Sequence, residues 1–424
     1  MTYTIISFHI PARSMSNTAV NQERFMLKKA DRIDGMALSE IVAISEEAAR
    51  LRAQGHDVLA LSTGEPDFPT PPHICDAAYR AMQDGQTRYP PTAGTAALRA
   101  AIAEKAGAEP GKVIVATGAK QVLADMFLAT LNAGDEVIVP APYWTSYSDI
   151  VALSGGETVL VRCGAAAGFK MTPAQLEAAI TPRTRWVLLN SPSNPSGAVY
   201  TAAELAALGQ VLARHPHVWI ASDEIYDLIC YVPFTSFREA CPDLAGRTIV
   251  INGVSKAHAM TGWRIGWGIA PADLVKAMLA VQGQITSGAC SIAQAAALEA
   301  VTGEQSHIPE RRDAFRDRRD FVVAALDAIP GISCPMPDGA FYVFPSCEAV
   351  LGQVTPDGKL LETDADFCAY VLAATGLAIV PGRAFGLPGH FRLSYAYARA
   401  DLEDGCARLN RAVDGLIPNQ RTAS

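Results

Sequence analysis

A chain of 424 residues with a half-apolar composition exceeds what one hydrophobic core usually organises, which predicts two domains. Its 35 basic and 43 acidic residues give a formal net charge of −8 without a long run of like charge, which argues against nucleic acid as a partner. No window reaches the roughly 18 uncharged apolar residues that span a bilayer, and the nine cysteines show no C-x-x-C spacing. We therefore expect a soluble, cytoplasmic protein with reduced thiols.

The chain begins without a regular pattern, and residues 1–35 are expected to form an N-terminal arm whose first 20 or so residues are mobile. The next segment, SEIVAISEEAARLRAQG at 39–55, places four apolar residues at helical spacing: Ile41, Ile44, Ala48 and Leu51. This spacing predicts an amphipathic helix that ends at Gly55.

Short β-rich runs then alternate with longer helical stretches up to about residue 310. The runs are VIVA at 113–116, VIVP at 137–140, WVLLN at 186–190, VWIAS at 218–222 and TIVIN at 248–252. This alternation predicts a mainly parallel sheet with helices on both faces, which is an α/β architecture.

The C-terminal part has a different pattern. A long polar helix is expected around 304–328, followed by a strand near GAFYVFPS (339–346), a helix near DADFCAYVLAA (364–374), and strands near LAIVP (377–381) and FRLSY (391–395). These elements predict a smaller α+β domain. We assign residues 36–60 and 320–424 to it, and residues 61–319 to the large α/β domain.

Four motifs with polar side chains follow the predicted strands. They are NSPSNPSG at 190–197, SDEIY at 222–226, NGVSK at 252–256 and MTGWRIG at 260–266. Open α/β sheets bind ligands at the carboxyl ends of their strands, and a hydroxyl, a lysine and an arginine together suit an anionic phosphate. A single S-K dipeptide is usually surface, and a single strand-end aspartate is usually a helix cap, so the inference depends on the whole set.

These motifs resemble those of the class I aminotransferases, enzymes that use pyridoxal 5'-phosphate (PLP). The resemblance extends over nearly the whole chain, because LSTGEPDFPTP (61–71), TRYPPTAGTAALRAAI (87–102), ATGAKQVL (116–123), PAPYWTSY (140–147) and FRLSYA (391–396) match in the same order. The bacterial aspartate aminotransferase subgroup is the most similar. The resemblance implies the PLP-dependent aspartate aminotransferase-like fold, PLP as cofactor, and an amino acid and a 2-oxo acid as substrates of a homodimer.

The resemblance also implies three catalytic residues. Lys256 would carry the cofactor as a Schiff base and later move a proton on the substrate. Asp223 would keep the pyridine nitrogen protonated. Tyr226, together with Asn194, would hydrogen-bond the 3-oxygen of the ring and lower the pKa of the Schiff base.

Further residues are implied in cofactor binding. Ser255 and Arg264 would bind the phosphate, along with the start of a predicted helix at Gly118, Ala119 and Lys120. Trp144 would stack on the ring, although a structural tryptophan is the alternative. Tyr89 would reach the phosphate of the neighbouring subunit, or else be an ordinary loop tyrosine.

The substrate residues implied are Arg392, for the α-carboxylate, and the backbone of Gly64, with Trp144, Asn194 and Lys120 completing the set. A surface arginine on a strand is the alternative for Arg392. Lys120 would face the distal carboxylate of aspartate or glutamate, or would support only the phosphate site. The chain departs from the subgroup at Ala37–Ile41, which reads A-L-S-E-I instead of K-P-S-A-T. We therefore expect weak or no use of prephenate.

Several alternatives stay open at this point. An aminotransferase for aromatic or neutral amino acids, a PLP-dependent β-lyase and a decarboxylase would share the same lysine chemistry. A PLP-binding transcription regulator is disfavoured, since about 35 residues are too few for a DNA-binding domain. A nucleotide-dependent oxidoreductase would need G-x-G-x-x-G or a P-loop, and the sequence contains neither. The eight histidines show no ligand spacing, so no metal is expected.

Overall fold

The computed structural model describes residues 29–34 and 40–419, except for the side chains of Asp34 and Ile41. The predicted mobile segment 1–20 lies outside these residues, as do Ala37, Leu38 and Ser39 of the A-L-S-E-I segment. Within the predicted irregular arm, the short helix α1 spans Asp31–Asp34. Helix α2 spans Glu40–Ala53, and Gly55 follows it with a φ of +88°, as expected for a glycine after a helix end.

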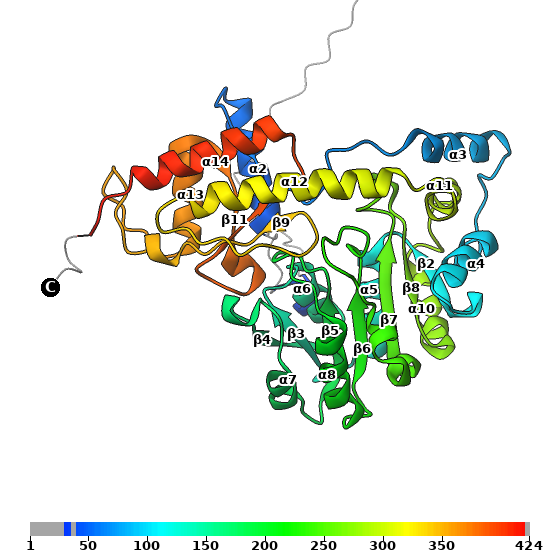
Figure 1. The fold of residues 1–424 in the computed structure, drawn as a ribbon. Helices are drawn as coiled ribbons and strands as arrows, with labels where there is room; N and C mark the ends of the chain where they lie inside the picture. The colour runs from blue at the N-terminus through cyan, green and yellow to red at the C-terminus, as the bar shows by residue number, and fades with distance from the viewer. Residues whose placement is uncertain (1–28, 35–39, 420–424) are drawn as a thin grey trace, which may run out of the picture.

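A seven-stranded sheet forms the centre of the molecule, in the order β2-β8-β7-β6-β5-β3-β4 (Figure 1). Its strands are β2 Val113–Ala116, β3 Glu136–Ala141, β4 Glu157–Arg162, β5 Thr184–Asn190, β6 Trp219–Asp223, β7 Thr248–Gly253 and β8 Gly266–Ile269. Only β8 runs antiparallel to its two neighbours. The mainly parallel sheet is therefore confirmed, with all five predicted strands in place, whereas β4 and β8 were not predicted.

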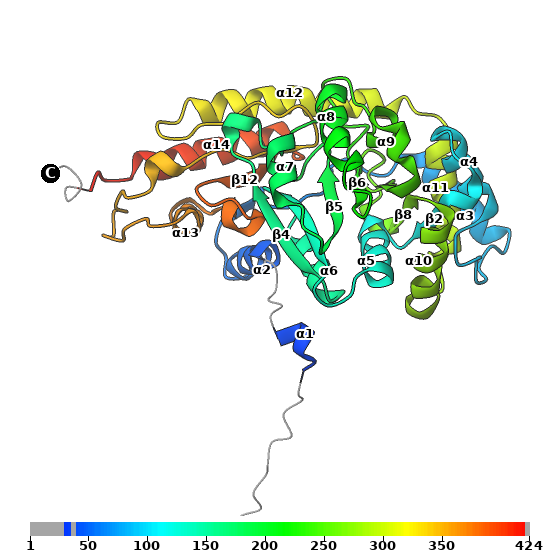
Figure 2. The same ribbon diagram turned by 90° about the horizontal axis from the view of Figure 1, so that it is seen from below.

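Helices cover both faces of this sheet (Figure 2). The helices of the large sheet are α3 Pro72–Gln83, α4 Ala96–Lys105, α5 Ala119–Thr130, α6 Ser146–Leu153, α7 Pro173–Ala179, α8 Ala202–Ala213, α9 Phe237–Ala240, α10 Ala272–Ile285 and α11 Ser291–Thr302. Alternate residues of each strand point to opposite faces, so Val137 and Val139 pack with α5, α6 and α10, while Ile138 packs with α7 and α8. Burial on both faces explains why the strands read as continuous apolar runs.

The C-terminal part folds around a second, smaller set of strands. Strands β9 (Tyr342–Val343), β11 (Val380–Pro381) and β12 (Phe391–Ser394) form an antiparallel sheet in the order β11-β12-β9, and β1 (Leu59–Ala60) pairs in parallel with β10 (Leu377–Ala378). The helices here are α12 His307–Asp327, α13 Asp364–Thr375 and α14 Arg399–Asp414. The β1–β10 pair joins the segment after α2 to the C-terminal part, so residues 59–60 and 377–378 lie in one layer.

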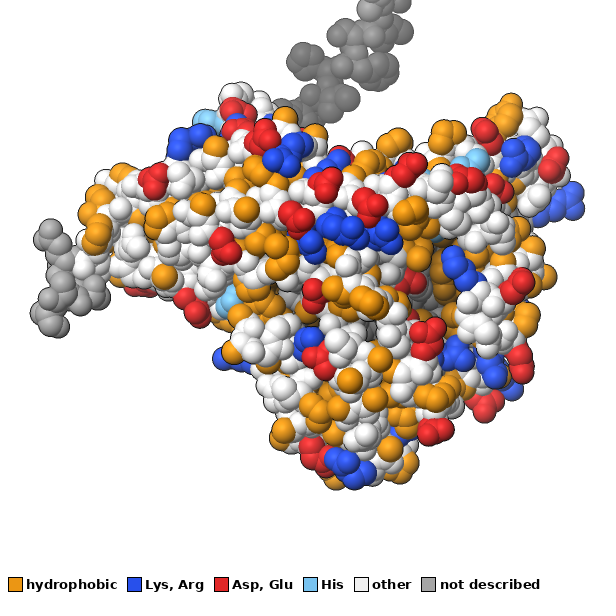
Figure 3. All heavy atoms as spheres, in the orientation of Figure 1, with side chains coloured by type: hydrophobic (Ala, Val, Ile, Leu, Met, Phe, Trp, Pro, Cys, Tyr) orange, Lys and Arg blue, Asp and Glu red, His pale blue; other side chains and the backbone are white. Residues whose placement is uncertain are grey.

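Helix α12 runs along the top of the molecule in Figure 1 and reaches from the smaller sheet to the helices beside the large one. Figure 3 shows basic and acidic side chains intermixed on the face that α12 presents. Two arginines of α12 contact the segment after β1. Arg318 forms an ion pair with Asp67 at 2.7 Å, and Arg311 donates to the Pro69 carbonyl at 2.6 Å. The segment 61–70 is thereby fixed between the two sheets.

Within the described part of the chain, six 3₁₀ helices complete the regular structure, at Pro110–Lys112, Ala165–Ala167, Pro242–Arg247, Thr261–Trp263, Glu348–Val350 and Gly382–Phe385. Across residues 29–34 and 40–419, no helix is both long and apolar enough to cross a membrane. In the same residues, no group of three or more His, Cys, Asp or Glu side chains is placed to hold a metal ion.

Candidate active site

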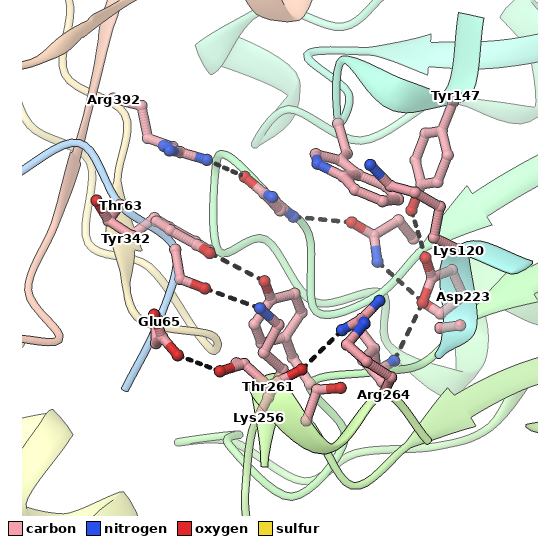
Figure 4. A pocket seen from close by; sticks show the side chains of 18 residues that line it. Thr63, Glu65, Lys120, Tyr147, Asp223, Lys256, Thr261, Arg264, Tyr342 and Arg392 are labelled. Carbon is pink, nitrogen blue, oxygen red and sulfur yellow. Dashed lines mark hydrogen bonds between the residues drawn. The ribbon is translucent and has the colours of Figure 1, made fainter. Parts of the chain in front are cut away.

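A cavity of about 370 Å³ opens where β5, β6 and β7 end, and it is closed on the other side by segment 63–65 and by the small sheet. Figure 4 shows its side chains pointing inward from both sheets. The lining residues are Thr63, Gly64, Glu65, Ala119, Lys120, Trp144, Tyr147, Asn190, Asn194, Asp223, Ile225, Tyr226, Ser255, Lys256, Thr261, Arg264, Tyr342 and Arg392. All the site residues predicted from the sequence are in this set except Gly118 and Tyr89.

Asp223 is the last residue of β6, so its side chain emerges at the carboxyl edge of the sheet. The carboxylate is 3% exposed, and it accepts hydrogen bonds from the Tyr147 hydroxyl at 2.6 Å and the Ile225 N–H at 3.2 Å. Burial raises the pKa of Asp223 to about 6, against the opposing effect of these hydrogen bonds. A buried carboxylate facing a cavity favours a ligand that brings a positive charge or an N–H donor.

Lys256 lies in the turn after β7, and its Nζ donates to the Gly64 carbonyl at 2.8 Å. Burial, with the nearby Arg392 as the next cause, lowers the pKa of Lys256 to about 8. The free energy needed to deprotonate the Lys256 amine near pH 7 is therefore small. A lysine of this kind can act as a nucleophile or a base.

Arg392, on β12, is 2% exposed, which contradicts the alternative that it is a surface arginine. Its Nη1 donates to Asn194 Oδ1 at 2.9 Å and its Nη2 to the Ser62 carbonyl at 2.5 Å, while its Nε has no partner among the described residues. The guanidinium lies over the rings of Tyr342 and Phe385, at 4.6 and 4.9 Å from their centroids. This charge is held rigidly, with no carboxylate within ion-pair distance among the residues described.

Hydrogen bonds connect Arg392 to the strand ends on the opposite side of the cavity. Asn194 accepts from Arg392 through its side chain and donates its backbone N–H to Asn190 Oδ1 at 2.8 Å. Asn190 Nδ2 donates in turn to the Asp223 carbonyl at 3.0 Å. The loop 190–197 therefore links the two sheets through polar contacts, which Figure 4 shows as a row of dashed lines leaving Arg392.

The opposite end of the cavity is formed by the start of α5. Gly118 is its N-cap, with a φ of +83° and no side-chain cap, so the first N–H groups of the helix remain free to bind an anion. A Cβ on Gly118 would lie only 2.6 Å from Arg264 Nη2, which explains why the position lacks a side chain. Arg264 itself is exposed and donates to the Thr261 carbonyl at 2.8 Å. Buried Ser255 lines the same end.

Lys120 and Trp144 form one wall near this end. The Lys120 Nζ lies 4.8 Å from the centroid of the Trp144 ring. Burial and then the charge of Arg264 lower the pKa of Lys120, against the opposing effect of Asp149. Lys120 is exposed, and its cation can pair with a further anion that enters the cavity.

Tyr89 lies apart from the other predicted residues. Its side chain is 94% exposed and does not line the cavity of its own chain. Its exposed phenol is available for the predicted contact with a second subunit.

Sequence reasoning missed seven residues that line the cavity, namely Thr63, Glu65, Tyr147, Asn190, Ile225, Thr261 and Tyr342. Three of these could have been found: Asn190 ends the WVLLN run, Tyr147 is one helical turn after Trp144, and Tyr342 lies in the GAFYVFPS strand. Glu65 and Thr261 are hydrogen-bonded to each other across 196 positions, a contact without local signature.

The fold and the cavity place an amine of lowered pKa between the free N–H groups of α5 and a buried carboxylate, an arrangement that suits the class of enzymes with an aldehyde cofactor. The sequence model described as "Aminotransferase class I and II" matches residues 56–409, and the chain belongs to this family. The PLP-dependent aminotransferase activity predicted from the sequence is thereby confirmed.

Individual relatives agree with this result. A protein of Rhizobium meliloti (strain 1021) named aspartate aminotransferase is 50% identical over 408 residues, which cover 94% of this chain and 99% of that protein. One of Cereibacter sphaeroides (strain ATCC 17029 / ATH 2.4.9) named aspartate/prephenate aminotransferase is 49% identical over 386 residues, which cover 89% and 96%.

The solved structures confirm the predicted fold class. The aspartate aminotransferase from Rhizobium meliloti superposes with a TM-score of 0.90 at 50% identity, covering 92% of this chain and 100% of that one. The aspartate aminotransferase from Thermus thermophilus with maleate gives a TM-score of 0.85 at 39% identity, covering 91% and 100%.

The residues present fit PLP, on two observations. The phosphate matches the end with the free N–H groups of α5, Ser255 and Arg264, where a glycine at position 118 lets the Arg264 guanidinium lie close to the start of the helix. The protonated pyridine nitrogen matches the buried Asp223 carboxylate, which lacks a cationic hydrogen-bond partner among the described residues. Lys256 lies in the same cavity.

Proposed function

We propose that the protein transfers the amino group of a dicarboxylic amino acid, aspartate or glutamate, to a 2-oxo acid such as 2-oxoglutarate or oxaloacetate, by a ping-pong mechanism. The observation that carries this proposal is the position of Lys256 in one cavity with a buried arginine, Arg392, and a second cation, the exposed Lys120. Two cations suit two carboxylates. The names of the relatives support the choice, as does the binding of a dicarboxylate, maleate, to the Thermus thermophilus enzyme.

When bound, PLP supplies an aldehyde that condenses with amines and a ring that accepts the electrons released at the substrate Cα. Lys256 would take the Cα proton as a neutral amine and return it to the neighbouring carbon, a role that its lowered pKa supports. Asp223 would keep the ring nitrogen protonated. Tyr226 and Asn194 would donate hydrogen bonds to the 3-oxygen, and Trp144 would stack on the ring.

Arg392 would bind the α-carboxylate through its guanidinium fork, which fixes the plane of the substrate and thereby orients the Cα–H bond. Its unpartnered Nε and its contacts with two aromatic rings support this role, because they leave hydrogen-bonding capacity while fixing the side chain. The backbone of Gly64 would approach the same carboxylate. Lys120 would face the distal carboxylate.

The cofactor phosphate would be bound by Gly118, Ala119 and the backbone of Lys120, with Ser255 and Arg264. We also propose a cytoplasmic homodimer in which Tyr89 reaches the phosphate of the neighbouring subunit, a role that its 94% exposure supports. The proposed division of the chain is an arm at 1–35, a small domain at 36–60 and 320–424, and a large PLP-binding domain at 61–319.

The use of prephenate is a separate question. The A-L-S-E-I segment lacks the lysine found in the resembling subgroup, and we propose weak or no prephenate turnover, with some tolerance for neutral or aromatic donors near Ile41. The side chain of Ile41 is outside the described residues. A relative named aspartate/prephenate aminotransferase gives the opposite expectation, so a direct assay with prephenate is needed.

The proposed function is tested by a scan of amino donors with 2-oxoglutarate, together with an assay for released pyruvate and ammonia. We expect aspartate or glutamate to give the highest kcat/KM, with little ammonia. A preference for neutral or aromatic donors, or ammonia release as the main reaction, would replace the proposal with one of the alternatives. Borohydride reduction should fix the cofactor on Lys256, whereas Asp223→Ala should lose most of the rate but retain bound cofactor.

A further inference from the structure

Tyr342 occupies a position between the two ends of the cavity that the proposed function does not use. It lies on β9, is 1% exposed, and lines the cavity together with Lys256. Its register partner on β12 is Ser394, two residues from Arg392, and the Arg392 guanidinium lies 4.6 Å from the centroid of the Tyr342 ring. The ring of Tyr342 therefore supports the arginine.

The hydroxyl of Tyr342 contacts a different residue. It lies 3.0 Å from the hydroxyl of Tyr226, within hydrogen-bond distance, and both side chains are buried (Figure 4). Among residues 29–34 and 40–419, neither hydroxyl makes another hydrogen bond. The backbone of Gly64 packs against the Tyr342 hydroxyl, where an added Cβ would clash, so this oxygen cannot move away from Tyr226 toward segment 63–65.

A count of protons fixes the direction of this bond when the cofactor is bound. Each phenol has one hydrogen to donate and lone pairs to accept with. If Tyr226 gives its hydrogen to the 3-oxygen of the cofactor, it has none left for Tyr342, and the remaining bond must run from Tyr342 to Tyr226. Hydrogen bonds in such a chain polarise one another, so a donor to Tyr226 strengthens the bond that Tyr226 donates onward.

We propose that Tyr342 is a positioning residue that acts through Tyr226: its hydroxyl donates to the Tyr226 oxygen and directs the Tyr226 hydrogen to the cofactor, while its ring supports Arg392. The proposal rests on the proposed role of Tyr226. It predicts that the hydroxyl and the ring of Tyr342 have separable effects, because they contact different partners.

The test is a pH titration of the visible absorption of the bound cofactor. In Tyr342→Phe the hydroxyl is lost and the ring is kept, so the apparent pKa of the cofactor should rise by about 0.5–1 unit, as expected for one hydrogen bond. The kcat should fall by roughly 3–10-fold with KM for the amino donor within about twofold of wild type. Tyr342→Leu, which also removes the ring, should in addition raise KM.

The chain offers a matched control. Buried Tyr395 forms a second hydroxyl pair, with partly buried Tyr231 at 3.1 Å; it also donates to the Ala340 carbonyl at 3.1 Å and does not line the cavity. Tyr395→Phe therefore removes the same atom from a tyrosine pair outside the cavity, and we expect it to leave the apparent pKa of the cofactor unchanged. An equal shift in both variants would mean a general effect on the fold and would overturn the proposal.

The variants Tyr226→Phe and Tyr226→Phe/Tyr342→Phe separate this inference from the proposed function. If Tyr342 acts through Tyr226, the double variant should have the apparent pKa of Tyr226→Phe alone. A shift in Tyr226→Phe without one in Tyr342→Phe overturns the inference and leaves the role of Tyr226 intact. An unchanged apparent pKa in Tyr226→Phe overturns both.

Discussion

The two ends of the cavity carry arginines in opposite environments. Arg392 is 2% exposed, hydrogen-bonded to Asn194 and Ser62, and in contact with two aromatic rings, whereas Arg264 is exposed and donates to one backbone carbonyl of its own turn. The first is fixed before any ligand binds. The second leaves most of its donors for a ligand, and it lies beside the free N–H groups of α5.

This difference has a physical reason. A substrate arrives and leaves in every turnover, so an arginine that fixes its plane contributes most when it is preorganised. A cofactor phosphate stays bound and can itself order the side chains around it. The comparison therefore predicts that changes at the Arg392 end affect substrate turnover, whereas changes at the Arg264 end affect cofactor affinity.

The largest effect is expected for Arg392→Ala. Loss of a buried charge that pairs with the substrate carboxylate should lower kcat/KM for the amino donor by about 3–5 kcal/mol, or roughly 10²–10⁴-fold. The cofactor dissociation constant should stay near that of wild type. Arg392→Lys, which keeps the charge but loses the fork, should recover only part of the loss. A loss of cofactor affinity equal to the loss of turnover would contradict the division between the two ends.

Arg264→Ala should give the converse result. One charged hydrogen bond to the phosphate contributes about 1.5–3 kcal/mol, so the cofactor dissociation constant should rise roughly 10–100-fold, as measured by fluorescence titration of the apoenzyme. At saturating cofactor, kcat/KM should change much less. Arg399→Ala removes an exposed arginine of α14 that pairs with Glu403, and serves as a control. Unchanged cofactor affinity in Arg264→Ala would remove this residue from the phosphate site.

Lys120→Ala tests whether the wall between the two ends selects the substrate. Removal of a partner for the distal carboxylate should lower kcat/KM for aspartate by roughly 1.5–3 kcal/mol and that for phenylalanine little. The measurement is kcat/KM for both donors in wild type and variant. Equal losses for the two donors would restrict Lys120 to the phosphate site and leave aminotransferase activity intact.

The smallest effect concerns the helix that forms the Arg264 end. Asp125 on α5 is fully buried, and burial raises its pKa to about 7, against the opposing effect of Gln121. Because the folded pKa lies above that of the unfolded chain, the carboxyl group destabilises the fold increasingly as the pH rises from about 4 to about 7.

Asp125→Asn removes this charge and should raise Tm by about 1–3 °C at about pH 8.5, and by less at about pH 5. Differential scanning fluorimetry of the holoenzyme at both pH values measures the difference. A Tm change that is the same at both would mean that the charge of Asp125 is not the cause.

The outline of the large sheet followed from the sequence, except for two strands. The five predicted strands are apolar on both faces, so their runs are continuous. Edge strand β4 reads ETVLVR and has a largely exposed pattern, and β8 reads GWGI, with two glycines that carry no β signal. The positions of β4 and β8 in the sheet depend on pairing with neighbouring strands. The same holds for the two-residue strand β1, which is too short for any periodicity, whereas its partner β10 lies in the predicted LAIVP run.

The sequence by itself determined the chemical groups at the strand ends, because three of the four motifs begin where a parallel strand ends and these strands end at one edge. Only the tertiary structure decided how these groups contact one another. Tyr147 meets Asp223 across 76 positions, Tyr342 meets Tyr226 across 116, and Asn194 meets Arg392 across 198. Periodicity and turn residues report on neighbours along the chain, whereas the first of these pairs forms where a helix packs on the large sheet and the other two form where the two sheets pack together. The position of Tyr342, and with it the proposed control of Tyr226, is therefore a property of the packing.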